Sequence, residues 1–247
     1  MLCEIHDPHT QDLLRRAALG VGHKFLEVGC GLGYVSRWAA TRAAHVTALD
    51  LSDEHLAEAR RMAEAAGLRN IEWRNANIYD HGLPEKTFDY TYNRWILVHL
   101  NRPIDAMRQL FGLLKPGGLM ICEEPVVDSV YSEPTTEGYS RHAQLAQALS
   151  VTRKVDYNGG RRLHSWAAEA GFEIVDVTAY QPHYLTGPRK GFYSWTIEAA
   201  GPALIADGIL TQENLQSVLA AMRAADDDPR VMVAGYRQHQ LIARRPG

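Results

Sequence analysis

The stretch Glu27-Val-Gly-Cys-Gly-Leu-Gly33 decides the fold of this 247-residue chain. It follows the short apolar run Lys24-Phe-Leu-Glu-Val28 and precedes a segment, 34–43, whose apolar residues recur at helical spacing. A glycine-rich turn between a buried strand and a helix lets the backbone approach a ligand at the edge of an open parallel sheet. The stretch therefore predicts an α/β fold with a ligand beside this turn.

Strand and helix signals alternate on both sides of the turn. Further strands are predicted at 45–50, 71–74, 88–92, 119–124 and 173–180, with a final edge strand within 231–244. Helices are predicted at about 7–20, 52–67, 104–114 and 163–170, the first two with the N-caps Asp7 and Ser52. Pro8 suits the first helical position after Asp7. This order predicts a doubly wound, mostly parallel sheet of seven strands.

Composition and charge exclude several classes of function. With 46% hydrophobic residues the chain can form a sizeable core, and its net charge of −3 does not suit a nucleic-acid partner. Cys3, Cys30 and Cys122 are odd in number and lack CxxC spacing, so they predict neither a disulfide framework nor a zinc site. No apolar stretch approaches 18 residues, and the first residues do not resemble a signal peptide. We therefore expect a cytoplasmic protein that uses no metal and contacts neither nucleic acid nor a membrane.

Four features together resemble the class I S-adenosylmethionine-dependent methyltransferases. In that family the first strand leads into a stretch of the form acidic residue-x-Gly-x-Gly-x-Gly, and here Glu27 is its acidic residue. A second acidic residue closes the family's second strand, as Asp50 does here. The segment 88–100 resembles the family's fourth strand and the chain behind it, and Leu-Leu-Lys-Pro-Gly-Gly at 113–118 is a further hallmark. A dinucleotide-binding fingerprint fits less well, because Tyr34 stands where a small residue is required.

The resemblance implies S-adenosylmethionine as the cofactor and S-adenosylhomocysteine as its product. Asp50 is expected to accept hydrogen bonds from both ribose hydroxyls. Asn77 stands where the family usually has an aspartate bound to the adenine amino group, and Asn75 is the alternative because the register is open by a residue or two. The complete set of implied cofactor residues is Glu27, Gly29, Gly31, Gly33, Asp50, Leu51, Asn77, Ile78, Asn93 and Arg94.

The resemblance also implies the domain organisation. We expect one methyltransferase domain over 1–247, with a cofactor-binding core at about 24–124. The segments at about 125–160 and 181–230 interrupt the alternation and are expected to form a helical substrate cap, with one helix at 139–149. Aromatic residues are frequent in these segments and suit an apolar acceptor, so Tyr184 is a candidate substrate contact.

Methyl transfer from a sulfonium is an in-line displacement, so alignment and exclusion of water are the main requirements. His99 is the candidate general base, because an imidazole titrates near neutrality, and a structurally packed histidine is the alternative. Glu123 and Glu124 close the fifth strand, where alternation points one of them toward the site. That carboxylate would orient a polar acceptor, unless it faces solvent or caps a helix.

We therefore expect methyl transfer to an O, N or C nucleophile of a small molecule, of the kind found in natural-product metabolism. A protein or RNA methyltransferase is one alternative, and it would need a basic groove. A second is a cofactor-bound enzyme that catalyses a non-methylating reaction such as cyclisation, and a third is a non-catalytic binding module. The acceptor and the oligomeric state stay open, and a homodimer is compatible with the sequence.

Overall fold

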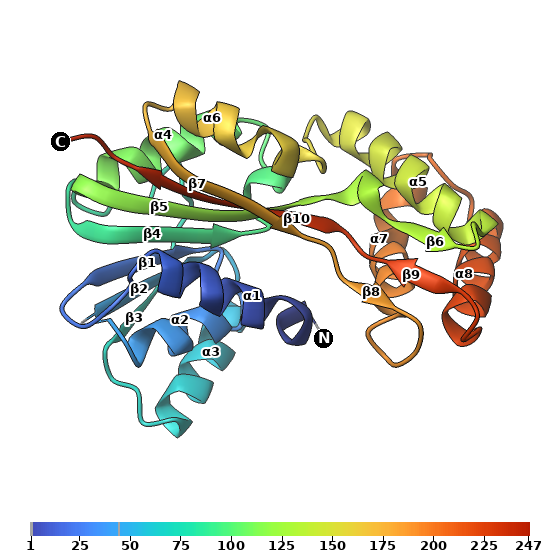
Figure 1. The fold of residues 1–247 in the computed structure, drawn as a ribbon, viewed down its shortest axis with the longest axis horizontal. Helices are drawn as coiled ribbons and strands as arrows, with labels where there is room; N and C mark the ends of the chain where they lie inside the picture. Colours follow the sequence, from blue (N-terminus) through green and yellow to red (C-terminus); the bar gives the residue numbers. More distant parts are fainter. Residues whose placement is uncertain (1, 44) are drawn as a thin grey trace.

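The computed structural model describes residues 2–43 and 45–247, which form an α/β core and a smaller cap (Figure 1). The core sheet has the strand order β3-β2-β1-β4-β5-β10-β7. Its first five strands in chain order are parallel, and β10 is antiparallel to both of its neighbours. The predicted seven-stranded, mostly parallel sheet is confirmed. The strands are β1 (Lys24–Val28), β2 (His45–Asp50), β3 (Ile71–Asn75), β4 (Phe88–Arg94), β5 (Leu114–Val126), β7 (Glu173–Tyr180) and β10 (Arg237–Arg244).

Helices cover both faces of the sheet, as the period-2 alternation of apolar side chains requires. On one face, Phe25 and Ile121 pack under α1 (Leu2–Arg16) and α2 (Tyr34–Ala40), and α3 (Asp53–Ala65) lies on the same side (Figure 1). On the other face, Leu26 and Met120 pack under α4 (Pro103–Leu113) and α6 (Leu163–Glu169). Ser52 caps α3 as predicted, since its Oγ accepts a hydrogen bond from His55 N at 3.1 Å.

The predicted start of the first helix is wrong. Helix α1 begins at Leu2, with Pro8 inside it, and ends at Arg16 rather than near Gly20. Asp7 does not cap the helix, because its carboxylate accepts a hydrogen bond from Arg94 Nη1 at 3.0 Å. Arg94 ends β4, so this ion pair fixes α1 at the carboxyl edge of the sheet.

The predicted edge strand is also wrong, because β10 lies between β5 and β7. Two buried glutamines gave this strand its polar appearance. Gln238 Oε1 accepts a hydrogen bond from Trp95 Nε1 at 2.7 Å, and Gln240 Nε2 donates to Glu123 Oε2 at 2.8 Å. Gln238 Oε1 and Gln240 Nε2 therefore have polar partners in the interior, which allows the strand to be buried on both faces, although Gln238 Nε2 has no partner among the described residues. Strand β7 is the edge strand on this side of the sheet, and β3 is the edge strand on the other side.

The cap holds three longer helices, one of which includes the predicted helix at 139–149, and a small antiparallel sheet that was not predicted. Leu145, Ile197 and Met222 belong to its own apolar cluster, which is separate from the clusters of the core. Strands β5 and β10 join the core to this cap, β5 running toward the cap and β10 running back from it (Figure 1). The cap elements are β6 (Tyr131–Glu133), α5 (Glu137–Arg153), β8 (His183–Tyr184), α7 (Phe192–Ala206), α8 (Gln212–Asp227) and β9 (Met232–Ala234).

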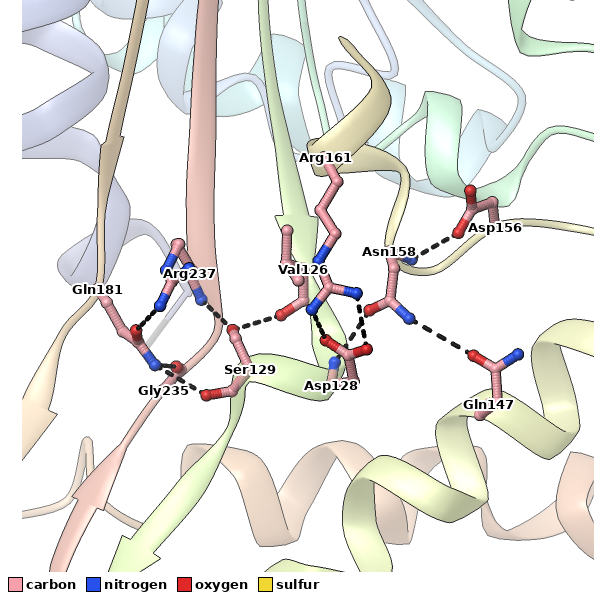
Figure 2. Close-up of polar contacts among 10 residues, drawn as sticks. All are labelled: Val126, Asp128, Ser129, Gln147, Asp156, Asn158, Arg161, Gln181, Gly235 and Arg237. Carbon is pink, nitrogen blue, oxygen red and sulfur yellow. Dashed lines mark hydrogen bonds and ion pairs between the residues drawn. The ribbon is translucent and has the colours of Figure 1, made fainter.

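A group of polar contacts joins the core to the cap beyond the carboxyl end of β5 (Figure 2). Arg161 of the turn η3 (Gly159–Arg162) donates from both of its terminal nitrogens to Asp128 of the turn η2 (Val127–Ser129). Ser129 Oγ accepts a hydrogen bond from Arg237 N at 2.7 Å, and Ser129 O accepts one from Gln181 Nε2 at 2.8 Å. These contacts link the end of β5, the start of β10 and the chain after β7. None of the helices in the described residues combines the length and apolar character needed to cross a membrane.

Candidate active site

The glycine-rich turn adopts a backbone conformation that favours glycine. Gly29, Gly31 and Gly33 have φ angles of 71°, 50° and 67°. A Cβ on Gly29 would lie 2.0 Å from Ile96 Cδ1, and one on Gly33 would lie 2.4 Å from the Trp73 ring. Among the described residues nothing lies within 4 Å of a Cβ built on Gly31. Packing therefore requires glycine at positions 29 and 33, whereas the backbone at Gly31 is uncovered.

Asp50 ends β2 beside the open glycine. Its Oδ2 accepts a hydrogen bond from Gly31 N at 2.7 Å, and its Oδ1 accepts one from Ser52 N at 3.0 Å. A carboxylate oxygen has two acceptor sites, so each oxygen can accept one more hydrogen bond. The next residue, Leu51, is 67% exposed. The turn thus places an acceptor group and an uncovered apolar side chain next to the open backbone of Gly31.

The chain after β3 offers one exposed amide. Asn75 Nδ2 donates to Asp53 Oδ1 at 2.7 Å and to Leu51 O, so Asn75 holds the neighbouring loop. Asn77 is exposed, and its Oδ1 accepts a hydrogen bond from Tyr79 N at 3.0 Å. The side chain of Ile78 is buried in the core. Both predicted asparagines are exposed, but the amide nitrogen of Asn75 is engaged with the neighbouring loop, and Ile78 can face a ligand only through its backbone.

Glu27 does not face open space, because it is buried beneath the turn with 4% exposure. It accepts a hydrogen bond from Ser36 Oγ, which joins the end of β1 to helix α2. Burial raises the pKa of Glu27 to about 7, and the hydrogen bond from Ser36 opposes this rise. Glu27 thus stabilises the turn from its buried side, and its contact with the cofactor stays a prediction.

Glu124 and Asn93 form a second buried polar pair, which holds the chain that follows β4. Glu124 Oε1 accepts hydrogen bonds from Asn93 Nδ2 at 3.0 Å, Ile96 N at 3.0 Å and Leu97 N at 2.8 Å. Burial raises the pKa of Glu124 to about 7, although the backbone N–H groups favour its charged form. The carboxylate caps the turn η1 (Leu97–His99), so its predicted substrate contact is wrong and the capping alternative applies.

Glu123 points to the opposite face of the sheet and is also completely buried. It accepts hydrogen bonds from Tyr92 OH and Gln240 Nε2, each at 2.8 Å, and from Thr10 of α1. Arg94 lies beside it and donates to Thr10 Oγ1 at 2.9 Å. The predicted substrate contact of Glu123 is therefore wrong as well, because its acceptor sites serve the packing of α1.

A cavity of about 190 Å³ lies between the η1 turn and the cap. Val98 and His99 of η1 line it, and apolar residues of α5 and α7 form much of its wall, among them Leu145, Leu149, Ile197 and Leu204. Ile96 fills the space above Gly29, and Val98 stands two residues further along the same segment. One short segment thus separates the glycine-rich turn from the cavity.

His99 stands in this cavity wall. Its ring packs edge-on against Tyr157, with ring centroids 5.5 Å apart. The side chain of His99 is exposed, and partial desolvation by the surrounding protein, with the charge of Arg153, lowers its pKa. Its ring nitrogens have no hydrogen-bond partner in the described residues. Tyr184 is not part of the wall: it is half-buried on β8 against the apolar cluster of the cap.

Sequence reasoning missed three polar groups of the wall. His142 Nε2 lies 2.9 Å from Tyr236 OH and 3.3 Å from Thr196 Oγ1. Burial lowers the pKa of His142 to about 3, so the ring is neutral. These residues come from distant parts of the chain, and no local pattern joins them. Trp95, also in the wall, has a φ of 58°, a conformation that costs a non-glycine residue about 1–2 kcal/mol and is frequent at functional sites.

The described residues contain no group of three or more His, Cys, Asp or Glu side chains arranged to hold a metal ion. Cys30 and Cys122 are buried free thiols. The side chain of Cys3 lies outside the described part of the chain.

Comparison with known proteins identifies the core. Residues 26–122 match a family model described as a methyltransferase domain. An S-adenosyl-L-methionine-dependent Diels-Alderase of Talaromyces variabilis is 30% identical over 57% of this chain and 48% of its own length. A ubiquinone biosynthesis O-methyltransferase of Cereibacter sphaeroides is 35% identical over 41% of this chain and 40% of its own length. The structure of phosphoethanolamine N-methyltransferase 2 of Haemonchus contortus, in complex with S-adenosyl-L-methionine, superposes with a TM-score of 0.62 at 18% identity, covering 97% of this chain and 53% of the other.

Residues 26–122 carry a methyltransferase domain, and the chain has the Rossmann-like fold of the class I S-adenosylmethionine-dependent methyltransferases. The cofactor of that class is S-adenosylmethionine. The chain spans 40–48% of the length of the first curated relatives that it matches.

Proposed function

We propose that this protein transfers the methyl group of S-adenosylmethionine to an O, N or C nucleophile of a small, largely apolar molecule bound in the cavity. One observation carries the proposal: the segment from Ile96 to His99 packs on the glycine-rich turn and also lines the cavity. A cofactor on the turn and an acceptor in the cavity would therefore be neighbours. The apolar wall suits an apolar acceptor, and the net charge of −3 does not favour nucleic acid.

The residues of the turn fit the cofactor. The open backbone of Gly31 allows close approach, and the Asp50 carboxylate has acceptor sites left for two ribose hydroxyls. Leu51 offers an uncovered apolar surface for the adenine ring, and the amide of Asn77 lies nearby for its polar edge. When bound, the cofactor supplies a methyl group made electrophilic by a positively charged sulfur.

The chain's own contributions are positioning, exclusion of water and the handling of one proton. Glu124 fixes the η1 turn through backbone hydrogen bonds, and the cap closes an apolar wall around the acceptor. The lowered pKa of His99 favours its neutral form, and its ring nitrogens have no hydrogen-bond partner among the described residues, so it can take the proton of a hydroxyl or amine acceptor. We expect it to act as the base where the acceptor must be deprotonated.

A second candidate is a ring-forming reaction that leaves the methyl group in place. It is supported by the similarity to the Diels-Alderase of Talaromyces variabilis and by the fold shared with the [4+2]-cyclase SpnF, which has a TM-score of 0.64 at 20% identity. The two candidates differ in one product, because only methyl transfer converts S-adenosylmethionine to S-adenosylhomocysteine.

The test is to incubate the protein with S-adenosylmethionine and a panel of apolar phenols, amines and enols, and to measure S-adenosylhomocysteine by mass spectrometry. With a turned-over acceptor, His99→Gln should lower the single-turnover rate by about 10²–10⁴ and leave cofactor affinity unchanged. His164→Gln, an exposed histidine on α6, is the matched control. Binding of the cofactor without S-adenosylhomocysteine, together with cyclisation of a linear polyene, would establish the second candidate instead.

A further inference from the structure

The hydrogen bonds around His142 set the position of its proton. Thr196 Oγ1 donates to Tyr193 O at 2.7 Å, so it can only accept from its other two neighbours. Tyr236 OH lies 2.9 Å from Thr196 Oγ1 and 2.9 Å from His142 Nε2. All of these contacts are satisfied together only if Tyr236 donates to Thr196 and His142 Nε2–H donates to Tyr236. We assign this tautomer from the network.

The assignment leaves His142 Nδ1 as an acceptor without a donor. This atom is buried and has no hydrogen-bond partner among the residues whose side chains the structure describes. Unpaired buried polar atoms are rare in folded proteins, because each costs about 1–3 kcal/mol. A water molecule needs two to four polar partners, and the surrounding wall is dominated by apolar side chains such as Leu145 and Ile197. A ligand is therefore the more suitable partner.

Two aromatic residues pack against Tyr236 in the same cluster. The ring of Tyr193 packs edge-on against that of Tyr236 at 5.0 Å. Trp95, whose backbone has the left-handed conformation, also packs on Tyr236, with ring centroids 5.7 Å apart. A polar atom without a partner among the described residues and one strained residue thus lie beside a single tyrosine at the cavity wall.

We propose that His142 selects the acceptor by accepting a hydrogen bond on Nδ1 from a hydroxyl or N–H group, so that the substrate class is a flat, mainly apolar molecule carrying a donor such as a phenol. This inference rests on the proposed function, which makes the cavity the acceptor site. Because Nδ1 is closed to water in the structure, a neighbouring side chain must shift when the acceptor binds. His142 is a specificity-determining residue here, and His99 remains the candidate base.

The test uses three probes that differ only at one position: 2-naphthol, 2-methoxynaphthalene and naphthalene. Their affinities are measured by fluorescence or calorimetry on the full chain with S-adenosylhomocysteine present. We expect 2-naphthol to bind about 3- to 10-fold more tightly than either of the other two, since only it can donate to Nδ1. In His142→Phe the three affinities should become equal. In His142→Asn, whose amide oxygen can take the place of Nδ1, the preference should return.

His164→Phe is the matched control, because it removes an exposed histidine of α6 outside the cavity wall. The preference for 2-naphthol should survive in this variant. Equal binding of 2-naphthol and 2-methoxynaphthalene by the wild type would overturn the proposal, as would a preference that persists in His142→Phe or disappears in His164→Phe. If His142→Phe does not fold, the wild-type comparison and the His142→Asn arm still decide. These measurements need no turnover, so failure of the proposed methyl transfer is seen separately, as absent S-adenosylhomocysteine.

Discussion

At the scale of single residues, the carboxyl edge of the sheet carries two kinds of acidic side chain. Asp50 keeps acceptor sites available beside open backbone, whereas Glu27, Glu123 and Glu124 are buried and bonded to the protein itself. Both kinds lie toward the carboxyl ends of strands, so their place in the sequence does not separate them. The hydrogen-bond partners separate the two kinds, and these partners come from other elements of the fold. Glu27 is bonded to Ser36, Glu123 to Gln240, and Glu124 to the backbone N–H groups at the η1 turn.

Asp50→Ala should weaken the binding of S-adenosylhomocysteine by about 2–3 kcal/mol, because two ribose hydroxyls would lose an ionised acceptor. Calorimetry on the purified variant measures this loss. Asp53→Ala is the control, since Asp53 lies three residues away and bonds to Asn75. A folded Asp50→Ala variant that binds as tightly as the wild type would refute the ribose assignment.

Glu27 should make stability depend on pH. Its folded pKa of about 7 lies above the ordinary value of 4.5, so the folded state holds the proton more tightly than the unfolded state. Its contribution is complete below pH 4.5 and is lost as the pH rises through about 7. Glu27→Gln cannot ionise, so its unfolding free energy relative to the wild type should rise by about 3 kcal/mol between pH 4.5 and pH 8. Urea titrations at both values measure this difference, and an unchanged difference would contradict the predicted pKa.

At the scale of elements, the glycine-rich turn combines a packing role with a binding role. Gly29 and Gly33 lie against Ile96 and Trp73, and Gly31 has open space above it. This division is invisible in the sequence, where all three glycines occupy equivalent places in the motif.

Gly31→Ala and Gly29→Ala should therefore fail in different ways. Gly31→Ala should remain folded, with about 1–2 kcal/mol of backbone strain, and should lose most of its cofactor affinity because the methyl group occupies the open space. Gly29→Ala should lose more stability, since its methyl group would overlap Ile96. Thermal unfolding and calorimetry on both variants separate the two effects. Tight cofactor binding by Gly31→Ala would show that the ligand does not approach this glycine.

Elements with strong local signals were predictable, and elements set by long-range contacts were not. Strand β1 and the Ser52 cap follow from neighbouring residues, whereas the turn that Pro116-Gly-Gly118 suggests is part of strand β5. The start of α1 could not be predicted in this way, because Asp7 forms its ion pair with Arg94, which is distant in the sequence. The interior place of β10 depends on partners for its buried glutamines, and three-residue strands such as β6 and β9 are too short to leave a pattern. For the same reason His142 escaped notice: its partner Tyr236 is 94 residues away.

At the scale of the whole molecule, the core and the cap have separate apolar clusters joined by two strands and a polar junction (Figures 1 and 2). Separate clusters allow the two parts to open independently, since most stabilising contacts lie within each part. The cavity lies where they meet. Motion of the cap would therefore admit an acceptor without disturbing the glycine-rich turn.

Ser129→Ala should loosen this junction. The change leaves Arg237 N without its acceptor and should lower the unfolding free energy by about 1–2 kcal/mol. In hydrogen exchange followed by mass spectrometry, peptides of α5 and α8 should exchange faster, while those of β1 and β4 keep their protection. Ser165→Ala, an exposed serine of α6, is the control. Equal acceleration in the core and the cap would show that the two parts open as one unit.

The interior position of β10 also determines when the sheet can be completed during synthesis on the ribosome. Strands β5 and β7 do not pair with each other, and each pairs with β10. Until residues 237–244 have been made, both strands present unpaired backbone groups, which are a template for association with other nascent chains. The parallel half, β1 to β4, can assemble much earlier. Chaperone dependence and translation-linked aggregation should therefore concentrate in the late stage of synthesis, between the emergence of β7 and that of β10.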